Sequence, residues 1–479
     1  MKAPSMTRLS RRLKLPALAS AALVLAGCAS VNMDQTLQDT NLQTGGFTQG
    51  KLDLSLTAAQ QQARAKLSSE LLATPLGMDD AVQLALSNSP AVQTLLAQSW
   101  MDLSQASQMG RIANPVFTFE RMRFGEELEI GRLLSFGLLD LLTLPRRQAI
   151  AESRSAQVKV QLAANVVDQI TQVRQAWVRS VSAQQSLQYA EQINTAAQAS
   201  AELAKRMQQV GNFTKLQRAR QQVFYADAVA RLATSRHAVT AAREELIRQL
   251  GLTDAQASEL KLPDRLPDLP KSPKQADAIN AIAPDQRLDV QIARNQLDMA
   301  GKSQGLTLLT SLVDVELGIR RDTVFDNASG GSTPRKGFEL AIRLPIFDWG
   351  NAQRDAMNAR SLAAANRYES TVRGATSQLR ESYSAYRTAY DLARHYRDEI
   401  VPLRKTMSEE NVLRYNGMLI GVFELLAEHR DQIAAVLAAI NAEQQFWLAD
   451  AALSASLTGK PTNMMMAAPP TGAATAAGH

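Results

Sequence analysis

Side chains capable of catalysis or metal binding are few in this chain and poorly placed for either role. It has one cysteine and four histidines among 479 residues. The first three histidines fall on predicted helices with no second histidine or cysteine at metal-ligand spacing. Gly330-Gly331 lacks the following Lys-Ser/Thr of a phosphate-binding loop. We therefore expect no catalytic residue, metal site, cofactor or enzymatic activity; the histidines are His237, His395, His429 and His479.

The C-terminal segment 460–479 contains the one remaining cluster of soft ligands. Met464, Met465 and Met466 are consecutive, and His479 ends the chain. Thioethers are good ligands for Cu(I). The surrounding Ala, Pro and Gly residues are more typical of a disordered tail, so a disordered tail is the prediction, with copper binding as the alternative.

The single cysteine, Cys28, follows a segment with the features of an export signal. Residues 1–27 carry five basic groups and no acidic one, and the apolar stretch 15–24 is too short to span a membrane. The small residues just before Cys28 resemble a bacterial lipoprotein signal, which makes Cys28 the predicted lipid attachment site. Ala29 follows it, and by resemblance to lipoprotein sorting rules this favours the outer membrane. The alternative is an incidental cysteine in an ordinary secretory leader.

Charge and hydropathy narrow the function classes further. Five of the six net positive charges come from residues 1–27, so the rest of the chain is close to neutral. This argues against nucleic-acid binding. No later run of about 18 apolar residues occurs, and no transmembrane helix is predicted.

The elements that would position any site are two long helical rods. No Gly or Pro occurs between Arg146 and Val210, and after Gly211 none occurs before Gly251. An uninterrupted helix of the first length spans roughly 95 Å. Its apolar residues step by three or four, as in a helix packed along one face; they are Val166, Ile170, Val173, Trp177 and Val181. This stripe fits packing against neighbouring rods or an ordinary coiled coil equally well.

The second half of the chain repeats the pattern of the first, which suggests an internal duplication. Each half should contain a helix, a β-hairpin, a long helix and a returning helix. A Gly should reverse each rod in a left-handed conformation, Gly211 in the first half and Gly417 in the second. The predicted order is a signal (1–27), a mostly irregular tether (28–75) with one helix over 58–72, a first repeat (76–260), a Pro-rich linker (261–275), a second repeat (276–459) and the tail (460–479).

The two hairpins are predicted at 115–144 and 313–346. Pro145 should end the first. In the second, residues 314–320 and 338–344 alternate strictly between apolar and polar. Outer-membrane barrels show this alternation, and so do soluble two-sided hairpins. The intervening Arg321–Lys336 is rich in Gly, Ser, Asp and Asn and suits a long extracellular loop.

Four segments together resemble the TolC family of outer-membrane efflux proteins: Leu344–Gly350, Met78–Pro90, Val210–Thr214 and Tyr415–Gly417. The family implies a mainly α fold with a small β part. Three chains would form a homotrimer, with four strands each in a 12-stranded outer-membrane β-barrel that continues into a long periplasmic α-helical barrel. The implied function is a passive duct in a tripartite efflux system, lipid-anchored in the outer membrane of a Gram-negative bacterium.

The resemblance also implies partners and sites. A periplasmic adaptor and an inner-membrane pump would be the partners, and the turns at Gly211-Asn212 and Gly417-Met418 would dock the adaptor. In the family, two acidic residues near the second turn narrow the tunnel entrance. In this chain Glu424 occupies the first of these positions and Ala427 the second, so Glu428 would have to substitute for the missing second carboxylate. Glu424 as a solvated surface charge is the alternative. Rival functions are a periplasmic coiled-coil structural lipoprotein without a pore and an outer-membrane component of protein secretion; the exported substrate is not identified.

Overall fold

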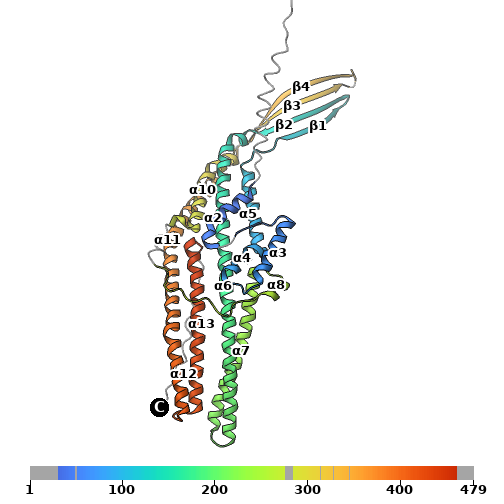
Figure 1. The fold of residues 1–479 in the computed structure, drawn as a ribbon. Coiled ribbons are helices and arrows are strands. Elements are labelled where there is room, and N and C mark those ends of the chain that lie inside the picture. Colours follow the sequence, from blue (N-terminus) through green and yellow to red (C-terminus); the bar gives the residue numbers. More distant parts are fainter. Residues whose placement is uncertain are drawn as a thin grey trace, which may run out of the picture.

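The computed structural model describes residues 31–48, 51–275, 284–312, 314–326, 328–344 and 346–460. The molecule is elongated, with a four-stranded sheet at one end and two inter-helix turns at the other (Figure 1). Cys28, the signal segment 1–27, the methionines at 464–466 and His479 lie outside the described residues. Among the helices that are described, none combines the length and apolar character needed to cross a membrane.

The first rod is the longest helix of the described chain. Helix α6 (Leu138–Gln209) has 72 residues, a length of roughly 108 Å. Helix α7 (Lys215–Leu250) returns beside it (Figure 1). The predicted apolar stripe is buried: each of its five side chains is at most 1% exposed. The prediction of one continuous helix over the run without Gly or Pro is therefore confirmed.

The predicted end of the first hairpin was wrong. Strand β2 stops at Gly137, and Pro145 lies inside α6 rather than before it. Proline at this position removes the N–H that would bond to the Leu141 carbonyl, and its ring crowds the same carbonyl. The preceding leucines are good helix formers, and Asp140 suits the positive N-terminal end of the helix. Together these local preferences outweigh one missing hydrogen bond.

The second half contains the same order of elements with one interruption. After η1 (Pro284–Gln286) and α10 (Leu288–Leu312), the sheet strands lead into α11 (Asn351–His395), η2 (Tyr396–Ile400), α12 (Val401–Asn416) and α13 (Val422–Thr458). Segment η2 is π-helical, and the Val401 N–H bonds to the Tyr396 carbonyl five residues back. Pro402 follows immediately and has no N–H to offer, which accounts for wider winding at this point. The duplication of the two halves stays a prediction.

The two hairpins form one antiparallel sheet in the order β1-β2-β3-β4. Its strands are β1 (Val116–Phe124), β2 (Glu127–Gly137), β3 (Val315–Asp326) and β4 (Gly331–Ile342). The central pairing, Leu134 opposite Ile319, joins the two halves of the chain. The predicted long loop at 321–336 was wrong, because cross-strand pairing continues to Asp326 opposite Gly331. Turn-like composition was overridden there by the ladder of backbone hydrogen bonds.

The register sorts the side chains of the sheet onto two faces. Phe117, Leu134, Ile319 and Phe338 stand in one row across all four strands. We call the face that carries this row the apolar face. All of β4 is exposed, and the outer edges of β1 and β4 have no strand partner among the described residues. Such edges are ready to pair with further strands.

The predicted tether is docked on the helices rather than irregular. Helix α2 (Met33–Thr48) was not expected, because its sequence contains Gly45-Gly46. Its threonines recur every four residues and are buried, and the hydroxyls of Thr40 and Thr44 donate to carbonyls one turn earlier, both at 2.8 Å. Helix α3 (Ala58–Leu72) was predicted, and its Thr57 forms a capping box with Gln60.

The main core forms where the N-terminal segment meets the middle of α6. Leu52 and Leu76 pack there with α4 (Met78–Asn88) and α5 (Pro90–Met109). The Trp177 indole N–H donates to the Leu76 carbonyl at 2.8 Å, which satisfies a fully buried donor. After α7 and α8 (Asp254–Glu259) the Pro-rich linker has no regular structure, as expected, but Leu266 and Leu269 are buried. Leu266 packs in the main core and Leu269 in a cluster with α11 and α13, so the linker contacts both halves of the chain.

Candidate functional site

The turn between α6 and α7 has the geometry of a Schellman motif. Gly211 has φ +84°, its N–H donates to the Gln208 carbonyl, and the Asn212 N–H donates to the Met207 carbonyl at 2.9 Å. These two bonds satisfy carbonyls that the end of α6 would otherwise leave free. Thr214 then caps α7 in a capping box with Gln217. The predicted left-handed role of Gly211 is confirmed.

The turn between α12 and α13 uses the same motif with a different residue at its centre. Here Gly417 has φ −80°, and Met418, with φ +61°, takes the left-handed position. The Leu419 N–H donates to the Arg414 carbonyl at 2.8 Å, and the Met418 N–H donates to the Tyr415 carbonyl. The left-handed role predicted for Gly417 was therefore wrong, since helical geometry continues one residue further. Met418 is the only non-glycine residue with positive φ in the described part of the chain.

The two turns lie against each other although they are far apart in sequence. The rings of Phe213 and Phe423 are 4.3 Å apart between centroids. Around this contact the surface is apolar: Met418 is 93% exposed and Leu419 74%. Val210 and Leu216 of the first turn are also exposed. Exposed apolar residues gathered at one tip are typical of a protein interaction site. Sequence reasoning found the turns but missed the Phe213–Phe423 contact, because no local pattern links residues 210 positions apart.

The two predicted gate residues lie in different environments. Glu424 is exposed in the first turn of α13, and no ion pair or side-chain hydrogen bond involves it within the described residues. Glu428 lies one helical turn on; its side chain is 14% exposed, and Arg404 of α12 approaches it at 3.4 Å. Arg404 also lies 3.9 Å from Asp431. Glu428 thus joins α12 to α13, whereas Glu424 has no ion-pair partner among the described residues.

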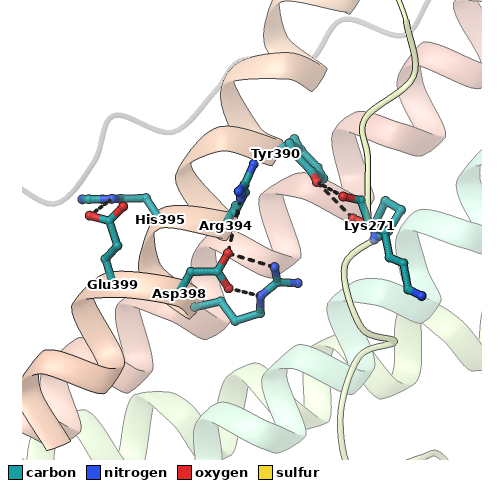
Figure 2. A network of polar contacts seen from close by, with 8 residues as sticks. Lys271, Tyr390, Arg394, His395, Asp398 and Glu399 are labelled. Atoms are coloured by element: carbon teal, nitrogen blue, oxygen red, sulfur yellow. Dashed lines mark hydrogen bonds and ion pairs between the residues drawn. The ribbon is translucent and has the colours of Figure 1, made fainter. Parts of the chain in front are cut away.

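A second polar cluster surrounds the π-helical segment and was not anticipated. Asp398 accepts hydrogen bonds from Arg397 at 2.7 Å and from Arg394 at 3.3 Å, as Figure 2 shows. The bond from Arg397 lowers the pKa of the Asp398 carboxyl. His395 and Glu399 form a pair of the same i, i+4 kind at 3.1 Å. Pro402 in an otherwise unbroken helical pattern was the sequence signal for a break at this place.

The same cluster is anchored to the Pro-rich linker. The buried Tyr390 hydroxyl donates to the carbonyls of Pro270 and Lys271, at 3.1 and 3.2 Å (Figure 2). On the neighbouring helix, the Trp447 indole N–H donates to the Pro267 carbonyl at 3.1 Å. The linker thus holds α11 and α13 together on the side of the π-helical segment. No group of three or more His, Cys, Asp or Glu suited to a metal ion occurs within the described residues.

Comparison with known proteins shows which family the second half of the chain resembles. The family described as outer membrane efflux protein matches residues 285–458, from η1 to the end of α13. This match covers the second half of the chain only. The resemblance to the TolC family is therefore confirmed. A search of curated protein sequences gives no match.

Solved structures extend the likeness to nearly the whole chain. The Campylobacter jejuni CmeC outer membrane channel matches with a TM-score of 0.65 and 14% identity over 86% of this chain and 89% of that one. The Vibrio cholerae outer membrane protein VceC gives 0.63 and 15%, over 80% and 96%. The open-state Neisseria gonorrhoeae MtrE outer membrane channel gives 0.60 and 19%, over 80% and 89%. The chain thus shares its fold, mainly helical with a small antiparallel sheet, with these three outer membrane proteins.

Proposed function

We propose that this chain is the outer-membrane channel component of a tripartite efflux system, a passive duct across the periplasm and outer membrane. The observation that carries the proposal is the sheet: a four-stranded ladder with an apolar face and two edges that no described strand pairs. It is attached to α6, a helix more than three times as long as the hydrocarbon core of a bilayer is thick. The family match and the shared fold support it. A periplasmic spacer protein without a pore would have no use for an exposed apolar sheet.

The same sheet supports an assembly of several chains, and we propose a trimer. Strands within a membrane must have no free edges, and four strands cannot close on themselves with room for a duct. Sharing strands between three chains would pair the β1 edge of each with the β4 edge of its neighbour. The helices would then continue the barrel into the periplasm, and Cys28 would carry the lipid anchor at the outer membrane.

Conductance in planar bilayers tests the duct directly. The purified full-length protein should insert and give stable current steps, and chemical cross-linking should give a trimer. A protein that stays monomeric and never conducts would refute the duct and favour the spacer. Export of a polypeptide, the function of a secretion component, would be detected instead by cargo accumulating in the periplasm when the gene is deleted.

The inter-helix turns are the proposed adaptor-docking site. The α6–α7 and α12–α13 turns, which contain Gly211, Asn212, Gly417 and Met418, lie at the end of the molecule farthest from the sheet (Figure 1). Exposed apolar side chains gather around these turns. Cysteines introduced at Asn212 and Met418 should cross-link to a periplasmic adaptor that works with an inner-membrane pump. Cross-links found only from positions near the Pro-rich linker would contradict this placement.

A further inference from the structure

The apolar face of the sheet carries basic side chains but no acidic one. The register assigns to it the odd-numbered residues of β1 and β3 and the even-numbered residues of β2 and β4. The opposite face holds seven acidic residues and two basic ones in the same strands. We call the basic group on the apolar face the basic belt; its members are Arg121, Arg123, Arg132, Arg321 and Lys336.

Three members of the basic belt stand side by side in one row. Arg132 of β2 lies opposite Arg321 of β3, and Arg321 lies opposite Lys336 of β4. Neighbouring strands are about 4.8 Å apart, and like charges directly opposite each other destabilise a sheet. An arrangement of three adjacent cations is therefore unfavourable unless an anion lies against it.

No carboxylate in the described part of the chain supplies that anion. Within the described residues, none of the five belt side chains forms an ion pair; the one polar contact is from Arg132 to the Thr323 hydroxyl at 3.4 Å. On the other face the contrast is clear, because Arg320 lies 3.0 Å from Glu120 and 2.8 Å from Asp322. The sheet thus pairs Arg320 on the opposite face, whereas the belt has no ion pair among the described residues and is largely exposed.

The position of the belt indicates the class of anion. Below it, toward the helices, the apolar face has three successive rows without a charge, which begin with Phe338, Leu340 and Ile342 on β4. Above it, only two more rows separate it from the hairpin ends, and these hold Arg121 and Arg123. The belt thus lies at the distal border of an apolar band. At such a border a bilayer presents its headgroups.

We propose that the basic belt binds the phosphate groups of a phosphorylated lipid headgroup in the outer leaflet. This inference rests on the proposed function, since it requires the sheet to span the outer membrane. Guanidinium groups hold phosphate oxygens through paired hydrogen bonds, and the lysine adds a point charge. The acyl chains of the lipid would lie along the apolar rows of the same face. One lipid would thereby neutralise the row of cations that the protein leaves unpaired.

Lipid retention by the reconstituted full-length protein tests the belt. The probe is diphosphoryl lipid A at low content in phosphatidylcholine nanodiscs, with lipid bound to the protein counted by native mass spectrometry. A charge near an anionic lipid surface changes binding by about fivefold. Lys336→Gln should therefore lower retention by about fivefold, and the triple variant Arg132→Gln, Arg321→Gln, Lys336→Gln by on the order of a hundredfold.

Arg335→Gln is the matched control, because Arg335 is the neighbour of Lys336 on the opposite face of β4 and is equally exposed. It should leave lipid retention unchanged. Equal loss in both single variants, or no loss in the triple variant, would overturn the belt. Displacement of the lipid by millimolar inorganic phosphate would overturn the lipid assignment and leave a simple anion site. Conductance of the same preparation separates the hypotheses: a wild-type channel that conducts but retains no lipid A refutes only the belt.

Discussion

Replacing Met418 with glycine should stabilise the turn between α12 and α13. A non-glycine residue in the left-handed region costs roughly 1–2 kcal/mol, and Met418 occupies that region with φ +61°. Glycine loses roughly 0.4–1 kcal/mol of this gain through the greater freedom of the open chain. The net effect on local opening should be about 0.5–1 kcal/mol in favour of the closed turn.

Hydrogen exchange at the Leu419 amide measures this effect, because that N–H closes the turn by donating to the Arg414 carbonyl. Its exchange should slow by roughly two- to fivefold in Met418→Gly. Gly211→Met is the reciprocal change: a Cβ at Gly211 would meet no atom within 4 Å, so only backbone strain is added. Exchange of the Asn212 amide should then accelerate by a similar factor.

The result that would refute this reasoning is a pair of unchanged rates, or a faster Leu419 amide in Met418→Gly. A second readout connects the strain to the proposed docking role. The Met418 side chain is almost fully exposed and makes no ring or polar contact in the described chain. If it is retained at this strained position for binding, Met418→Gly should weaken adaptor binding while it stabilises the turn.

Three further predictions concern charge and anchoring. Glu424→Gln should reduce the cation preference of single channels and Glu424→Lys should reverse it, because three copies would form a ring of charge. Unchanged ion selectivity in intact trimers would exclude Glu424 from the duct. Glu428→Gln should instead lower the stability of the α12–α13 hairpin, because it removes the ion pair with Arg404. Cys28→Ser should abolish palmitate labelling and leave unprocessed precursor; unchanged labelling would rule out Cys28. Burial, and then the nearby Asp268, raise the pKa of Glu443. The folded state therefore holds this proton more tightly, so stability is lost as pH rises above about 4. Glu443→Gln should raise the unfolding temperature at pH 7 but not at pH 3.5, and an equal rise at both would contradict the assignment.

The sequence was most informative where local pattern alone decides the structure. The rod of α6 follows from a long run without Gly or Pro, and the caps at Thr57 and Thr214 follow from a glutamine three residues on. Helix α2 could not be predicted in this way, since threonine and glycine have low helix propensity. It forms because its threonine face is buried against α6. Helix α2 therefore depends on contacts with residues distant in the sequence, which a local sequence pattern does not show.

The candidate site shows the same division. The glycines in the sequence indicate where the two turns lie. They do not indicate that α12 continues one residue further than expected, which places Met418 instead of Gly417 in the left-handed conformation. The status of Glu424 and Glu428 depended on Arg404, which lies on the preceding helix 20 or more positions away. Residues four apart on one helix face looked equivalent in sequence. Arg404 pairs with Glu428 across the hairpin, and Glu424 has no such partner in the described part of the chain.

The two helical hairpins, similar in outline, are unequal in how firmly they hold their shape. The first relies on α6, continuous over 72 residues and buried along its apolar stripe. The second contains the π-helical segment η2, and helices bend most readily at such bulges and at prolines. The ion pairs that brace η2, from Arg394 and Arg397 to Asp398, are all substantially exposed and so contribute little individually. The firmer attachment is Tyr390, buried and bonded to the linker. Any bending of the second hairpin should therefore occur at η2, beyond the fixed point at Tyr390, and it must break the Phe213–Phe423 contact if the first hairpin stays in place.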